Sequence, residues 1–114
     1  MGRENGDLLQ GTLGMLILKA VLGQELHGYG IARRIQDVTA DVLSIEEGSL
    51  YPALRRLEDR GWVESRWGIS ENNRRARYYS ITREGRRHLQ ADASAWMRFA
   101  GAVTLMLSAE PSLV

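Results

Sequence analysis

The sequence predicts a mainly α-helical domain with three helices, a two-stranded β-hairpin and a long C-terminal helix. Three observations predict it. Apolar residues recur at helical spacing in three segments before residue 60. Two short stretches rich in aromatic and branched residues then flank a polar segment, which is the pattern of a hairpin. A last apolar stripe follows, and a length of 114 residues suits one core.

The first two helices are expected over residues 8–22 and 29–38. In the first, leucine, isoleucine, alanine and valine recur on one face, and Gly23 is a plausible stop. A glycine-containing turn over residues 26–30 leads into the second helix, whose apolar pair is Ile31 and Ile35.

The third helix is expected to end near Asp59 and to begin at a capping box, with Ser44 as the N-cap and Glu47 three residues later. Its core-facing side chains are Leu50, Leu54 and Leu57. Pro52 removes a backbone donor, so it should lie near the helix start or bend the helix. Gly61 is the expected left-handed cap.

The hairpin is expected from strands at residues 62–67 and 76–81, with a polar, basic tip at 68–75. Thr82 can then cap a helix over residues 83–107. The apolar stripe of this helix has the alternating spacing of a coiled-coil seam and consists of Leu89, Ala93, Trp96, Ala100, Val103 and Leu107. Because a monomer would leave this stripe open to water, it predicts a homodimer.

This order of elements is that of a winged helix-turn-helix, and the charge distribution indicates what it binds. The whole chain carries only +1, but residues 55–87 hold ten arginines and five acids, a local excess of +5. The third helix would face the DNA major groove with Ser49, Tyr51, Pro52, Arg55, Arg56 and Glu58. The wing would add Asn72, Asn73, Arg74, Arg75 and Arg77. In the alternative interpretations, the tip is merely solvated and Arg55 and Arg56 pair with nearby acids.

The chain resembles the PadR family of transcriptional regulators at a series of short motifs between residues 8 and 107. The matching stretches are residues 8–13, 27–32, 48–54, 57–58, 61–62, 73–79 and 81–82, together with Gly85. The resemblance implies a homodimer formed by the last helix, a palindromic operator and a role as a repressor. It also implies that Pro52 is tolerated inside the recognition helix. The chain matches the family's short form, with a flexible N-terminus at 1–7, a DNA-binding domain at 8–81, a dimerisation helix at 82–107 and a tail at 108–114.

Some relatives bind phenolic or hydrophobic effectors between subunits, so Trp96, Met97 and Phe99 are candidates for an effector pocket. The alternative is that Trp96 is plain dimer core, since small neighbours suggest close packing. Trp62 and Trp67 are expected to pack within the hairpin.

Other functions are disfavoured by the residues that the sequence lacks. It contains no cysteine, and it shows no pairing of a nucleophile with a base, no metal-ligand spacing and no phosphate-binding loop. No enzyme activity, cofactor or metal is therefore predicted. His27 is expected to pack or hydrogen-bond, and His88 to lie on the surface or at the dimer face. A winged helix used only to bind proteins would lack the basic face. No signal peptide or membrane span is apparent, so the cytoplasm is expected.

Overall fold

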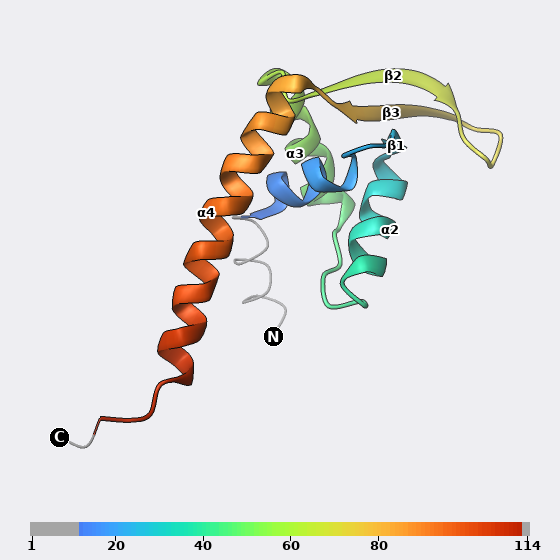
Figure 1. Ribbon diagram of the computed structural model, residues 1–114. Coiled ribbons are helices and arrows are strands. Elements are labelled where there is room, and N and C mark those ends of the chain that lie inside the picture. Colours follow the sequence, from blue (N-terminus) through green and yellow to red (C-terminus); the bar gives the residue numbers. More distant parts are fainter. Residues whose placement is uncertain (1–11, 113–114) are drawn as a thin grey trace.

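The computed structural model describes residues 12–112 and has the predicted winged helix-turn-helix architecture (Figure 1). A first helix includes residues 12–20. The elements that follow are β1 (Leu26–His27), α2 (Gly28–Val38), α3 (Glu47–Asp59), β2 (Val63–Ile69), β3 (Arg75–Ile81) and α4 (Arg83–Ser108). The predicted beginning of the first helix, the flexible N-terminus and the last two residues of the tail lie outside the described residues.

The core lies where the first helix, α2 and α3 meet the sheet. The expected core side chains are buried, namely Ile31, Ile35, Leu50, Leu54 and Leu57. They pack with Ile17, Leu18 and Val21 of the first helix, and with Val63 and Tyr79 of the sheet. Every buried side chain of this core is apolar or aromatic, so burial of nonpolar surface is the principal stabilising contribution.

The sheet has three strands in the order β1-β3-β2, and all pairs are antiparallel. The prediction of a plain turn over residues 26–30 is wrong for its first two residues. Leu26 and His27 form β1 by pairing with Tyr79 and Tyr78 of β3. A two-residue strand has no periodicity of its own, and its partner lies some fifty residues further along the chain, so local sequence carries no signal for it.

The predicted capping box at α3 is also wrong. The helix begins at Glu47, its N-cap is Glu46, and no side chain caps it. Ser44 precedes the N-cap by two residues and therefore cannot reach the first free amides. Pro52 lies inside α3, where the Gly48 carbonyl is left without its usual donor.

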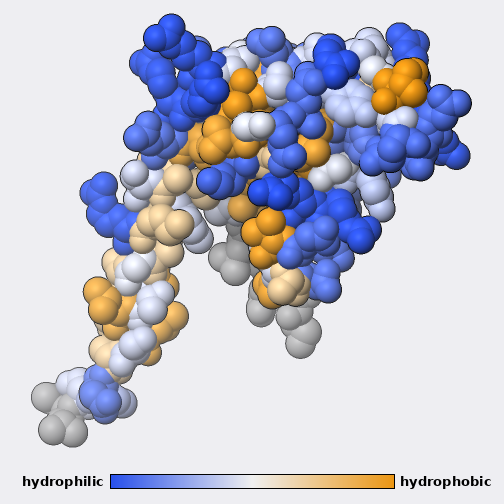
Figure 2. All heavy atoms as spheres, turned by 45° about the vertical axis from the view of Figure 1, so that its right-hand side comes forward, coloured by the Kyte–Doolittle hydropathy of each residue, from blue (hydrophilic) through white to orange (hydrophobic). Residues whose placement is uncertain are grey.

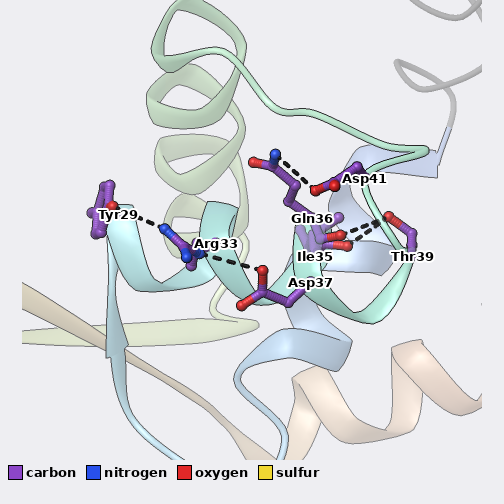
Figure 3. A network of polar contacts seen from close by, with 7 residues as sticks. All are labelled: Tyr29, Arg33, Ile35, Gln36, Asp37, Thr39 and Asp41. Atoms are coloured by element: carbon purple, nitrogen blue, oxygen red, sulfur yellow. Dashed lines mark hydrogen bonds and ion pairs between the residues drawn. The ribbon is translucent and has the colours of Figure 1, made fainter.

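Hydrogen bonds made by residues at the end of α2 fix the connection between α2 and α3 (Figure 3). The Thr39 hydroxyl donates to the Ile35 carbonyl at 2.8 Å and accepts from the Leu43 amide at 3.1 Å. The Gln36 amide donates to Asp41 at 3.1 Å. Asp41 has a φ of 68°, in the left-handed region that asparagine and aspartate tolerate better than most residues. These contacts fix the turn that sets α3 against α2.

The remaining helix ends follow the sequence more closely. Gly23 and Gly61 have φ values of 87° and 78°, as expected of left-handed stops. The Thr82 hydroxyl accepts from the Gly85 amide at 3.0 Å and caps α4. The strands are longer than predicted, so the wing turn shrinks to residues 70–74.

The helix α4 leaves the domain as a projecting arm, and the wing extends in another direction (Figure 1). Only Gly85 and Leu89 of α4 are buried. Because so few of its side chains are buried, most of α4 has no packing partner within one chain.

Within the described residues, no helix combines the length and the apolar character needed to cross a bilayer.

Candidate nucleic-acid interface

Five of the six candidate side chains on α3 are exposed: Ser49, Tyr51, Pro52, Arg55 and Arg56. They lie opposite or beside the buried face of the helix, so the sequence placed the inner and outer faces correctly. The structure also distinguishes the two flanks of this exposed surface, which periodicity alone did not.

Tyr51 lies on the flank that faces α2 and the wing. Its phenol ring packs so closely over Gly28 that a Cβ atom there would lie 2.6 Å from the hydroxyl oxygen. Gly28 is the first residue of α2, and its missing side chain makes room for the ring. This contact explains why glycine occupies that position.

Arg56 lies on the other flank, where it lines a cavity between the first helix, α3 and α4. Arg55 is exposed and forms no ion pair within residues 12–112, so the alternative interpretation, in which it pairs with nearby acids, does not hold there. Arg56 and Tyr51 therefore lie on different flanks of α3.

Glu58 does not face outward as expected. Its carboxylate accepts a hydrogen bond from the Ser65 hydroxyl at 2.7 Å and one from the Arg77 guanidinium at 3.2 Å. Arg77 also donates to the Ser65 hydroxyl at 2.8 Å. These three residues join the end of α3 to the base of the wing. The sequence missed this link because the partners are separated by up to 19 residues.

The wing turn presents Asn72, Asn73 and Arg74 to solvent. The Ser70 amide donates to the Arg74 carbonyl and the Asn73 amide to the Ser70 carbonyl, both at 2.8 Å. Asn73 adopts the left-handed conformation with a φ of 59°. These bonds make the turn a defined structure that carries its polar side chains outward.

Trp67 packs against two arginines of the opposite strand, as expected of a residue that packs within the hairpin, yet 54% of it is exposed. The guanidinium of Arg75 lies 4.3 Å from the ring centroid, and that of Arg77 lies 5.7 Å away. Its position two residues from the end of β2 is the signal that could have indicated exposure, because the core ends before that point.

Two polar contacts hold the wing against Glu25 and His27, just before and within β1. The Arg66 guanidinium donates to both carboxylate oxygens of Glu25, at 2.7 to 3.1 Å, and these hydrogen bonds lower the pKa of Glu25. The His27 Nε2 atom lies 3.5 Å from Glu71 in the wing turn. The pKa of Glu71 is lowered by its own backbone amide and, second, by His27.

His27 also caps α2, since its Nδ1 atom accepts from the Gly30 amide at 3.0 Å. This agrees with the hydrogen-bonding role expected of it. No cluster of histidine and acidic side chains suited to a metal ion occurs between residues 12 and 112.

One cleft of about 650 Å³ brings these elements together. It lies between the start of α2, the Tyr51 flank of α3 and the wing. Of the candidate residues, Tyr51, Asn72, Arg74, Arg75 and Arg77 line the cleft, and Tyr29 and Trp67 line it as well. The remaining candidates on α3 and Asn73 lie outside this cleft.

Hydrophilic side chains dominate the surface of the domain in Figure 2, while the arm formed by α4 is much more apolar.

A second cavity, of about 500 Å³, lies between the first helix, α3 and α4. Trp96 and Phe99 line it, but Met97 does not and is 71% exposed. This cavity lies within one chain, whereas the predicted effector pocket lies between subunits. His88 also lines it, with its ring stacked 3.6 Å from Trp62 and its Nε2 atom 2.9 Å from Asp92. His88 is half-buried, and its contacts with Trp62 and Asp92 fix the position of its ring.

Three of the six residues of the predicted dimer stripe are exposed to solvent. Leu89 packs into its own domain, whereas Trp96, Val103 and Leu107 are 40%, 41% and 81% exposed. A second set, Phe99 and Met106, is exposed beside the stripe. The uncovered apolar surface is thus wider than a single coiled-coil seam.

Comparison with known proteins agrees with the fold and the motifs. The model of the transcriptional regulator PadR-like family matches residues 17–91. The chain belongs to this family. Family membership agrees with the prediction that the chain is not an enzyme, because this is a family of transcriptional regulators.

Individual PadR-like proteins are similar over most of their length. A PadR family transcriptional regulator from Eggerthella lenta is 29% identical with a TM-score of 0.79, and the match covers 96% of this chain and 93% of that one. A PadR-like transcriptional regulator from Bacillus cereus is 26% identical with a TM-score of 0.78, over 91% and 99% of the two chains. An uncharacterized protein from Lysinibacillus sphaericus is 30% identical over 90 residues, which are 79% of this chain and 83% of that protein.

Proposed function

We propose that this PadR-like regulator is a homodimeric repressor that binds duplex DNA at a palindromic operator. The observation that carries the proposal is the cleft in which the exposed Tyr51 flank of α3 meets the arginine-bearing wing. In a winged helix-turn-helix, these two elements contact the major groove and the adjacent backbone. Residues 8–81 would form the DNA-binding domain and residues 82–107 the dimerisation helix.

On α3, Tyr51 and Arg55 are the residues best placed to read bases. The Tyr51 ring packs against Gly28, which positions it. Arg55 has no acidic partner among the described residues that would compete with DNA for its guanidinium. An arginine in the major groove can donate two hydrogen bonds to one guanine. Ser49 and Pro52 would contact the neighbouring backbone and sugars. Arg56 is the least favoured, because it borders the cavity beside α4.

On the wing, Arg74 and Arg75 would contact phosphates, with Asn72 and Asn73 as hydrogen-bond donors beside them. Arg77 would contribute charge but stays tied to Glu58. Each phosphate contact releases condensed counterions, so binding should weaken steeply as salt rises.

The test is fluorescence anisotropy with labelled duplexes from the upstream region of the chain's own gene, over a range of salt concentrations. Arg74→Ala with Arg75→Ala should weaken binding to every sequence and reduce the salt slope by about two units. Arg83→Ala with Arg86→Ala removes the same charge from the start of α4 and serves as the control. No binding at low salt, or binding that ignores salt, would refute the DNA proposal.

The dimer is supported by the breadth of uncovered apolar surface on α4. Soluble monomers rarely leave such surfaces open, and a twofold pair would present two copies of α3 to two half-sites. Ala100→Glu, in the middle of the stripe, should give a monomer mass by light scattering. Ser94→Glu, an exposed position on the same helix, should leave the dimer intact. A monomer mass for the wild-type protein at micromolar concentration would refute the dimer.

Repression is inferred from the family resemblance and needs a separate test. A reporter gene placed behind the bound upstream region should be less active when the protein is expressed and recover with the double arginine variant. Higher reporter activity on expression would make the chain an activator.

The cavity beside Trp96 supports binding of a second ligand besides DNA, namely a flat hydrophobic or phenolic effector. Trp96 and Phe99 supply aromatic walls, while Met97 lies outside the lining. A planar aromatic dye should quench tryptophan emission, and Trp96→Ala should remove the high-affinity part of that quenching. Equal titrations for both proteins would leave Trp96 as plain dimer core.

A further inference from the structure

The inner face of the wing carries an alternation of apolar and cationic side chains. In the antiparallel pair of β2 and β3, Trp67 lies opposite Arg77, and Ile69 lies opposite Arg75. Directly opposed residues in such a pair share one face of the sheet. Tyr79 lies on this same face closer to the domain, opposite Ser65, and is buried. The face therefore begins in the core and continues outward along the wing as an open surface.

The apolar members of this face are uncovered. Trp67 is 54% exposed and Ile69 is 65% exposed, and the cleft that Trp67 lines also holds Tyr29 and Tyr51. A large indole at an exposed strand end contributes little to the core. Exposure of the ring to water is unfavourable, so covering it would make the free energy of binding a partner more favourable.

The arginines beside Trp67 are arranged before any ligand binds. Arg75 stacks on the indole, and Arg77 lies near the same ring while it is held by Glu58 and Ser65. A cation over an indole face is attracted to the ring, and it keeps its outer donors free. Ordering these long side chains in advance reduces the entropy that a charged ligand would have to offset.

We propose that Trp67 is a DNA-contact residue, whose indole packs on the sugars of the duplex backbone while Arg75 reaches a flanking phosphate and Arg77, held by Glu58 and Ser65, adds positive charge beside it. This inference rests on the proposed DNA binding and extends it to an apolar contact. Duplex DNA presents that combination of chemistry, because the nonpolar faces of its deoxyriboses alternate with phosphates along each strand. A protein partner would instead need acidic groups spaced to meet both arginines.

The test compares Trp67→Ala with Trp67→Phe by anisotropy, using the upstream duplex and a roughly 30-base-pair duplex of mixed sequence at low salt. Trp67→Ala should weaken binding by about tenfold, the size expected when a central aromatic contact is truncated. The salt slope should stay within one unit of wild type, because an indole displaces no counterion. Trp67→Phe should keep most of the affinity.

Val42→Ala is the matched control, since Val42 is an exposed apolar residue in the connection between α2 and α3. Thermal unfolding should show all three variants folded as wild type, because neither Trp67 nor Val42 is a core residue. Emission gives a second readout: addition of duplex should change the spectrum of wild type by a component that Trp67→Phe lacks.

Unchanged affinity in Trp67→Ala, or a spectral change that persists in Trp67→Phe, would overturn the inference while leaving the proposed DNA binding intact. Failure of the wild-type protein to bind either duplex would overturn the proposed function and this inference with it. A Trp67→Ala variant that loses the salt slope as well as affinity would show that the indole only positions the arginines.

Discussion

Replacing Gly85 with alanine should destabilise the domain although alanine is the better helix former. Gly85 is in the first turn of α4, where it lies against the backbone of Trp62, the residue just before β2. A Cβ atom there would overlap the carbonyl oxygen of Trp62 and approach Ile81 Cγ1 to 2.8 Å. The Trp62 oxygen is backbone and cannot move aside by a change of rotamer. It also accepts the Thr82 amide at 3.0 Å, so any displacement strains the entry into α4.

The magnitude follows from three opposing contributions. Overpacking of a tight site costs about 1–3 kcal/mol. Loss of the Thr82 hydrogen bond adds roughly 1 kcal/mol. The greater helix propensity of alanine returns up to about 1 kcal/mol. The free energy of unfolding should therefore fall by about 2 kcal/mol, a change that urea denaturation resolves easily.

Gly48→Ala is the matched control. Gly48 is also in the first turn of a helix, has an ordinary φ, and has no atom within 4 Å of its missing Cβ. This variant should be as stable as wild type or slightly more stable, by up to about 1 kcal/mol. If Gly85→Ala were also neutral or stabilising, the packing of α4 on the Trp62 carbonyl would be refuted.

Three further predictions concern the cap, the tyrosine and the tether of the wing. Thr82→Ala should lower the free energy of unfolding by about 1–2 kcal/mol, because the amide that this hydroxyl caps is left unpaired. Gly28→Ala should weaken DNA binding by displacing the Tyr51 ring, and should have little further effect once Tyr51 is alanine. Glu25→Gln should lower the melting temperature at neutral pH by removing the Arg66 ion pair. The pKa of Glu25 is lower in the folded chain than in the unfolded one, so its contribution is present above the unfolded pKa and lost as the pH falls through the folded pKa. The melting curves of wild type and Glu25→Gln should then converge in acid.

Each of these has a control and a contrary outcome. Ser94→Ala, at an exposed site within α4, should leave stability within about 0.5 kcal/mol of wild type. Equal losses for Ser94→Ala and Thr82→Ala would argue against a specific cap. Additive effects of Gly28→Ala and Tyr51→Ala would mean that the two sites act independently. Glu64→Gln, at an exposed acid with no ion pair in the described range, should show no such convergence. A pH-independent gap for Glu25→Gln would exclude its ionisation as the cause.

Apart from β1, the sequence by itself determined the order of the elements, and it also determined the inward faces of the helices. Ile31, Ile35 and the three leucines of α3 are buried as their spacing predicted, because helical periodicity is a local property of the chain. Gly23, Gly61 and Thr82 marked helix ends for the same reason, since a cap or a left-handed stop depends on adjacent residues. The motif series predicted the PadR-like family, which the comparisons confirmed.

Only the tertiary structure decided which exposed residues lie together. The pairing of β1 with β3 and the link of Arg77 to Glu58 join positions that are distant along the chain. The placement of Tyr51 and Arg56 on opposite flanks of α3 depends on what packs beside the helix. Trp67 illustrates the limit most clearly: it was expected to pack within the hairpin and contacts arginines of the opposite strand, but more than half of it stays exposed. Local pattern specifies the direction in which a side chain points, whereas the lengths and packing of other elements determine whether anything meets it there.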